Sequence, residues 1–145
     1  VAGPAVQAGA GNAGAGSRWR LVILEMDTGS AVPPYEQIRS QIATMIETGV
    51  LAGGHQLPPI RQLAGDLGLA VNTVARAYRE LETAGLVISR TRHGTTVAAG
   101  PARLPRAEIK RRLKAAARKY TALTQRLGVS ASEAEAAVRV ELGRS

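Results

Sequence analysis

The sequence predicts a mainly helical fold with one small β-hairpin, followed by a separate helical segment. Between residues 35 and 84, apolar residues recur at the three- and four-residue spacing of helices. Two short β-prone runs around a glycine-containing turn follow at residues 86–97. Gly100-Pro101 and Pro105 then mark a boundary, beyond which helical periodicity resumes. We therefore expect two parts, of which the first carries the hairpin.

The first 17 residues form an Ala/Gly-rich segment without a charged side chain. Such a composition buries too little apolar surface to order itself, so residues 1–17 are expected to be a flexible tail. The segment lacks the basic region and the dense apolar block of a signal peptide. Residues 18–24 are rich in β-branched and apolar residues and predict a short strand or an extended arm.

Three helices are expected next. The first begins at Pro33-Pro34 and ends at Gly49, because proline fits the first helical turn and glycine favours helix ends. The second opens at Pro58-Pro59 and stops at Gly68. After a tight turn, the third runs from about Asn72 to Ala84. Gly85 is well placed to end it in a left-handed cap.

A hairpin completes the first part. Residues 86–89 and 95–97 are β-prone, and residues 90–94 form the turn with its glycine. The order of helix, helix, turn, helix and hairpin is that of a winged helix-turn-helix, which we assign to residues 18–102.

Residues 103–145 predict a short two-helix tail. In its first helix, apolar residues are spaced by 4, 3, 4, 3 and 4, which is a heptad-like seam suited to pairing with a second copy of the chain. Ser130 and Glu133 form a capping-box pattern for the last helix. The residues expected in the dimer seam are Ile109, Leu113, Ala116, Tyr120, Leu123 and Leu127, with Val138 and Leu142 from the last helix.

The composition predicts an anionic partner. The net charge is +8 with a pI near 11.0, which suits double-stranded DNA. Nearly the whole excess lies in residues 103–126, which hold nine basic residues and one acidic residue. There is no cysteine and no metal-ligand spacing, so neither a metal nor another cofactor is expected. No run is long and apolar enough for a membrane span, and a cytoplasmic location is expected.

A helix that reads DNA needs small or polar residues at its N-terminal end and an apolar face toward its own domain. The third helix meets both demands, and a wing tip in such folds lies over the adjacent minor groove. Asn72 and Thr73 could instead only cap the helix, while Arg61 and His93 could be ordinary solvated side chains. The candidate DNA contacts are Arg61, Val71, Asn72, Thr73, Arg76, Arg79, Arg92, His93, Gly94 and Thr95.

Several motifs resemble the DNA-binding domain of GntR-family transcription regulators. They are Leu-Pro-Pro-Ile-Arg-Gln-Leu-Ala at 57–64, Val-Asn-Thr-Val-Ala-Arg-Ala-Tyr-Arg-Glu-Leu-Glu at 71–82, Gly-Leu-Val at 85–87 and His-Gly-Thr at 93–95. The two-helix tail is most similar to the YtrA subfamily. The resemblance implies a dimer on inverted repeats, usually repression, and often control of a transporter operon and of its own promoter. It also implies DNA contacts at Arg61, Asn72, Thr73, His93 and Gly94.

This chain departs from the family pattern at positions that affect which DNA sequence is preferred. Many members carry arginine where Val71 and Ala75 stand, a polar residue in place of Ala70, and Ser or Ala in place of Pro59. The recognition helix is therefore less basic than is usual in the family.

Three functions are compatible with the sequence. The first is sequence-specific regulation, the second is an architectural DNA-binding protein that uses the basic C-terminal helix, and the third is an interaction module for an acidic protein. An enzyme is not expected, because no catalytic arrangement of residues is present. The sequence leaves any small-molecule effector unknown.

Overall fold

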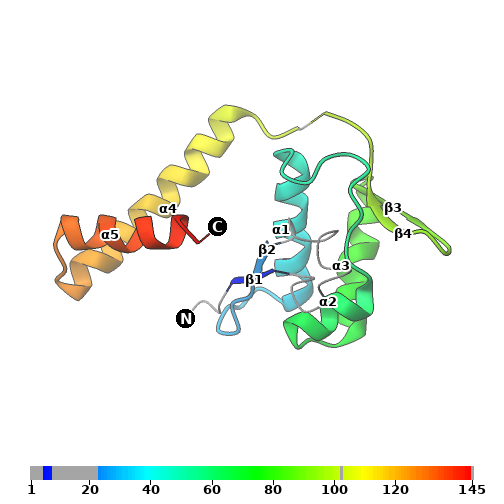
Figure 1. Ribbon diagram of the computed structural model, residues 1–145, viewed down its shortest axis with the longest axis horizontal. Coiled ribbons are helices and arrows are strands. Elements are labelled where there is room, and N and C mark those ends of the chain that lie inside the picture. The colour runs from blue at the N-terminus through cyan, green and yellow to red at the C-terminus, as the bar shows by residue number, and fades with distance from the viewer. Residues whose placement is uncertain (1–4, 8–22, 102, 145) are drawn as a thin grey trace. The chain divides into compact units, whose positions relative to one another are not determined.

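The computed structural model describes residues 5–7, 23–101 and 103–144. The chain divides into two compact units, Val1–Arg103 and Leu104–Ser145. Residues 18–22 of the strand or arm expected at 18–24, and most of the expected flexible tail, lie outside the described residues. Each unit is built from its own elements, which Figure 1 labels.

Strand β1 (Ala5–Gln7) pairs with β2 (Ile23–Glu25) in antiparallel register, with Val6 opposite Leu24. Residues 5–7 were expected to be part of a flexible tail, and for them that expectation is wrong. Strand pairing uses backbone N–H and C=O groups, which an Ala/Gly-rich segment offers as well as any other. Composition therefore could not reveal this pairing.

Two glutamines of α1 (Pro34–Glu47) hold the segment that precedes the helix. Gln41 Oε1 accepts a 2.8 Å bond from the Glu25 N–H, and its Nε2 donates 2.8 Å to the Glu25 carbonyl. Buried Gln37 does the same for Asp27, at 2.8 and 2.9 Å, and also donates to the Val32 carbonyl. Side-chain amides thus replace the strand partner that this backbone would otherwise lack.

The helices begin and end where proline and glycine predict. Helix α2 (Ile60–Leu67) starts after Pro59 and ends at Gly68, whose φ is 67°. Helix α3 (Val71–Thr83) starts one residue before the expected Asn72 and is followed by Gly85 at φ 76°. The N–H groups of Gly85 and Leu86 bond back to Glu82 and Leu81, the pattern of a Schellman cap.

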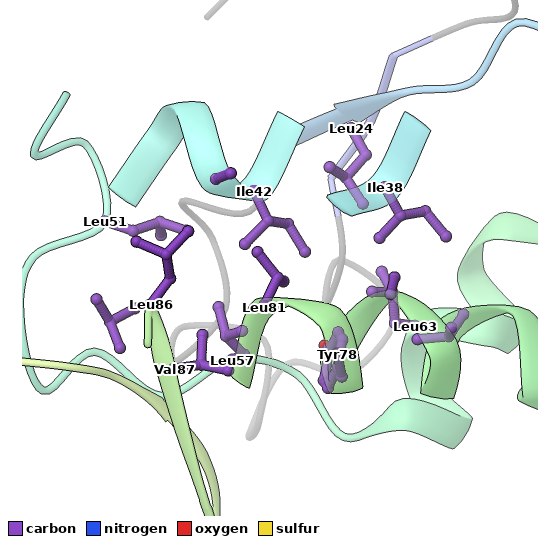
Figure 2. Close-up of a cluster of buried hydrophobic side chains, with 14 of the residues drawn as sticks. Leu24, Ile38, Ile42, Leu51, Leu57, Leu63, Tyr78, Leu81, Leu86 and Val87 are labelled. Atoms are coloured by element: carbon purple, nitrogen blue, oxygen red, sulfur yellow. The ribbon is translucent and has the colours of Figure 1, made fainter. Parts of the chain in front are cut away.

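The core of the first unit lies between α1, α2, α3 and the base of the hairpin (Figure 2). Helix α1 packs against α3, and β2 covers one end of this contact through Leu24. Side chains from distant segments interdigitate here because each helix presents one apolar stripe. The labelled core residues are Leu24, Ile38, Ile42, Leu51, Leu57, Leu63, Tyr78, Leu81, Leu86 and Val87.

Tyr78 joins α3 to the segment before α2. Its buried hydroxyl donates a 2.6 Å hydrogen bond to the Pro58 carbonyl, and burial raises the pKa of the phenol well above its ordinary value. Pro58 is itself fully buried, so its carbonyl cannot turn to water instead. This bond therefore fixes α3 relative to the start of α2.

Replacing Tyr78 by Phe is expected to cost about 1–3 kcal/mol of unfolding free energy, because it leaves the Pro58 carbonyl buried without a donor. Urea denaturation followed by circular dichroism measures the loss. Tyr120→Phe is the matched control, since the Tyr120 hydroxyl bonds Ala134 in the second unit at a half-buried site. An effect no larger than that of the control would show that the Tyr78 bond contributes little.

The hairpin consists of β3 (Val87–Arg90) and β4 (Gly94–Val97), paired antiparallel with Val87 opposite Val97. It projects from the helices of its unit (Figure 1). Gln56 forms a bridge to Thr96, and the Leu57 N–H donates 2.8 Å to the Thr95 carbonyl. The segment before α2 thus supports β4 as a third, very short strand. The expected winged helix-turn-helix is confirmed.

The second unit is a pair of helices, α4 (Arg106–Leu127) and α5 (Ala131–Leu142). Gly128 ends α4 at φ 69°. The Ser130 hydroxyl accepts a 3.1 Å bond from the Glu133 N–H, as its capping-box pattern predicts. The Tyr120 hydroxyl ties α4 to α5 by a 2.7 Å bond to the Ala134 carbonyl. No residue of either helix is buried, so this unit has no closed core of its own.

Candidate nucleic-acid interface

The N-terminal end of α3 is exposed and has no side-chain cap. Its N-cap is Ala70, which has no side chain able to accept a hydrogen bond, and neither Asn72 nor Thr73 caps the helix. Val71 is 46% exposed, Asn72 is exposed and Thr73 is half-buried. The first backbone N–H groups of a helix attract anions such as phosphate. This end of α3 therefore offers backbone N–H donors, the amide of Asn72, the hydroxyl of Thr73 and the methyl groups of Val71.

Two arginines extend this surface. Arg61 occupies the second position of α2 and Arg79 the third turn of α3, and both are exposed. Among the described residues, neither has an ion pair or a side-chain hydrogen bond that would hold it to the protein. Their guanidinium groups are thus available to phosphate or to a base edge.

Arg76 is placed differently from the other candidates. Its guanidinium lies 3.7 Å from the centroid of the Tyr35 ring and 3.6 Å from a carboxylate oxygen of Glu80. The stacking joins α3 to the first turn of α1. Arg76 therefore serves the helix packing in this structure, although its side chain is 53% exposed.

An ion-pair network extends this link between α1 and α3. Arg39 Nε donates a 2.7 Å bond to Glu36 and lies 3.9 Å from Glu80. The hydrogen bond from Arg39 lowers the pKa of the Glu36 carboxyl, and the same bond raises the pKa of Arg39. Sequence reasoning missed Tyr35, Arg39 and Glu80, because partners on α1 and α3 lie about forty residues apart in the chain.

At the wing tip, Arg92 and His93 are exposed, and Arg92 has a positive φ of 71°. Gly94 follows at φ 74°, and a Cβ there would lie 3.1 Å from Gln56 Nε2. Gln56 in turn donates 3.3 Å to the His93 carbonyl. Gln56 is therefore a support for the wing that sequence patterns did not indicate.

Thr95 has a structural partner across the hairpin. Its hydroxyl lies 3.1 Å from the Ser89 hydroxyl, on the opposite strand. Among the predicted DNA contacts of the wing, Arg92 and His93 thus have accessible side chains, while Gly94 and Thr95 shape and brace the turn.

The expected dimer residues all lie in the second unit, where they differ in how far they are exposed. Tyr120 is half-buried by its contact with α5, and Ile109 is also half-buried. Tyr120, Val138 and Leu142 line an open groove of roughly 640 Å³ between α4 and α5. The large apolar side chains that stay exposed, with their exposed fractions, are Leu113 (70%), Leu123 (44%), Leu127 (66%), Val138 (38%) and Leu142 (70%). Ala116 is exposed as well.

Among the residues that the structure describes, no group of three His, Asp or Glu side chains could hold a metal ion. No helix in the described ranges has both the length and the apolar character that crossing a membrane requires.

The family model described as "Bacterial regulatory proteins, gntR family" matches residues 34–97, which run from the start of α1 to the end of β4. The transcriptional regulator Rv1152 of Mycobacterium tuberculosis is 40% identical over 111 residues, covering 77% of this chain and 87% of that protein. The transcriptional repressor YtrA of Bacillus subtilis is 35% identical over 75 residues, which are 52% of this chain and 58% of YtrA.

Among solved structures, one described as a transcriptional antiterminator from Listeria monocytogenes has a TM-score of 0.51 and 28% identity, covering 80% of this chain and 87% of that one. The sequence match thus spans the helix-turn-helix and the wing, and the structural match spans most of the chain. The chain is therefore a YtrA-like member of the GntR family of bacterial transcription regulators.

Proposed function

We propose that this chain is a sequence-specific repressor that binds an inverted-repeat operator as a homodimer. The observation that carries the proposal is the uncapped, exposed N-terminal end of α3, with Arg61 and Arg79 unpaired among the described residues. Such an end can enter a major groove, where Asn72 could bond an adenine and Val71 could contact a thymine methyl group. The name of the relative YtrA as a repressor supports the direction of regulation.

The dimer is proposed from the second unit. Leu113, Leu123 and Leu127 are 70%, 44% and 66% exposed along one side of α4, and such a row of exposed apolar side chains is typical of an interaction surface. A second copy of α4 would bury these leucines and would itself be covered, as in a short coiled coil. Two winged units would then place their α3 helices in successive major grooves, about 34–36 Å apart.

The family resemblance extends the proposal to the regulated genes. A transporter operon and the chain's own promoter are the expected targets, and the protein would act in the cytoplasm. These targets follow from the resemblance alone, so they define which promoter duplexes to test first.

Arg61→Ala is expected to weaken operator binding several-fold without unfolding the winged unit, because the Arg61 side chain makes no hydrogen bond or ion pair within the described structure. Mobility-shift titration at fixed salt measures the effect. Arg139→Ala is the matched control, since it removes one exposed positive charge from α5. Equal affinities of the two variants would remove Arg61 from the interface.

An architectural DNA-binding protein is the second candidate, and the excess charge of α4 is the observation that favours it. Such a protein would bind any duplex through phosphates alone. Unlabelled random duplex would then compete with labelled operator as well as unlabelled operator does. Under the proposed function, random duplex competes much more weakly.

A further inference from the structure

A row of four basic residues runs along the N-terminal half of α4: Arg106, Lys110, Lys114 and Arg118. They are spaced four residues apart, so each lies about 6 Å further along the helix and is turned by only about 40°. The row therefore spans roughly 18 Å of α4 and winds by about 120° around the helix. All four side chains are exposed. We call these residues the basic row.

No anion in the described structure neutralises the basic row. The single acidic residue of α4 is Glu108, and it is engaged by Arg111 at 2.6 and 2.8 Å and by Arg112 at 2.9 Å. Hydrogen bonds from Arg111 and then Arg112 lower the pKa of Glu108 to about 2, so it stays ionised and paired. Like charges four residues apart destabilise a helix, so the row is unfavourable until an anion binds it.

Most of the basic row lies outside the two apolar contacts of α4, which are the groove toward α5 and the proposed dimer seam. The α4 residues that line the groove toward α5 are Tyr120, Thr121, Thr124 and Gln125, which all lie C-terminal to the row. Lys114 and Arg118 lie on a different side of the helix from the dimer seam, turned by about 100° and 140° from Leu113. Lys110 flanks the seam, and Arg106, seven residues before Leu113, lies on the seam side. The helix α5 therefore leaves the row accessible, and a second copy on the seam leaves Lys110, Lys114 and Arg118 accessible, which are the three residues substituted below.

We infer that the basic row binds the phosphate backbone of duplex DNA next to the operator, independently of base sequence. This inference rests on the proposed function, because DNA held by the winged unit keeps phosphates near the same chain. Duplex DNA presents one charge about every 3.4 Å along each strand, so a cationic row roughly 18 Å long spans several phosphates. DNA is favoured over a membrane surface because the winged unit of the same chain matches the family model of bacterial regulatory proteins.

The test uses the full chain with Lys110→Gln, Lys114→Gln and Arg118→Gln combined. The matched control combines Lys119→Gln, Arg126→Gln and Arg139→Gln, three exposed residues outside the row. Both variants lose three positive charges, so long-range attraction to DNA falls equally. Glutamine forms helices well, and circular dichroism and sedimentation confirm the fold and oligomeric state of each variant.

Binding to random-sequence duplex is measured by fluorescence anisotropy over a series of salt concentrations. Loss of three phosphate contacts should lower the slope of log affinity against log salt by about 2.7 and weaken binding at least tenfold at 0.1 M salt. The control should keep the wild-type slope to within about one phosphate contact. Substituting Lys110→Arg, Lys114→Arg and Arg118→Lys should retain the wild-type slope.

Equal slopes for the row variant and the control would overturn the inference, because charge alone would then explain any loss. Unchanged DNA binding with lost binding to anionic phosphatidylserine vesicles, or to polyglutamate, would assign the row to a membrane or an acidic protein and also overturn it. A wild-type chain that binds operator and random duplex equally would refute the proposed function. In that case a lowered slope in the row variant would still support this inference.

Discussion

A chain carrying Leu113→Glu is expected to sediment as a monomer and to bind operator at least tenfold more weakly. Leu113 is 70% exposed and lies within the proposed seam of α4. Burying a leucine contributes about 1.5–3 kcal/mol, and a symmetric dimer buries it twice. A buried, unpaired carboxylate would cost more still. Because about 1.4 kcal/mol is a tenfold change, the dimer should dissociate at micromolar concentrations.

Ala115→Glu is the matched control for this experiment. It adds the same charge to an exposed position of the same helix, away from the seam. The control should remain dimeric in sedimentation velocity and should bind operator close to wild type. A dimer that persists in the Leu113→Glu variant would move the interface elsewhere in the chain.

The second large effect concerns the core of the winged unit. Leu81→Ala is expected to lower the unfolding free energy by about 2–5 kcal/mol, because Leu81 is fully buried between α1 and α3 and its loss leaves a cavity (Figure 2). Urea denaturation of the full chain, followed by circular dichroism, measures the loss. Since domains of this size are only marginally stable, DNA binding should fail at temperatures that wild type tolerates.

Val50→Ala is the control for the core substitution, since Val50 is an apolar residue of the same unit with 52% of its surface exposed. Its expected effect is within about 0.5 kcal/mol. Comparable losses for Leu81→Ala and Val50→Ala would contradict the packing described for α3.

The parts of the fold that sequence predicts are those with local causes. Gly68, Gly85 and Gly128 end three helices at positive φ. Each helix end could be predicted from the sequence, because glycine adopts this conformation without strain. The β-prone runs of the hairpin and the spacing of core residues in α1 and α3 are likewise local patterns. The confirmed fold follows from these signals.

What the sequence could not predict depends on pairs that are distant in the chain. The stacking of Arg76 on Tyr35 gives a candidate DNA contact a packing role within the protein, and no periodicity in the sequence encodes it. The hydrogen bond from Gln56 to the wing and the bond between Gln41 and the Glu25 backbone likewise join residues that are distant in the sequence. Each is a side-chain hydrogen bond or ring contact whose partner becomes evident only once the helices are packed.

The candidate contacts themselves stay predictions, although the structure narrows their roles. Arg61, Asn72 and His93 are exposed, and no intramolecular bond in the described structure engages their side chains. Gly94 and Thr95 act on the shape of the wing, and Arg76 on the packing of α3. Sequence preference should therefore depend on a small and modestly charged set of side chains, while most of the net charge lies on α4.

Selection of bound duplexes from a pool of random DNA tests the central claim most directly. A sequence-specific dimer should enrich an inverted repeat whose half-site centres lie about 10–10.5 base pairs apart, or a multiple of that spacing. The enriched duplex should bind about a thousandfold or more tighter than random duplex at the same salt concentration. A pool in which no motif is enriched, and in which all duplexes bind alike, would contradict the account.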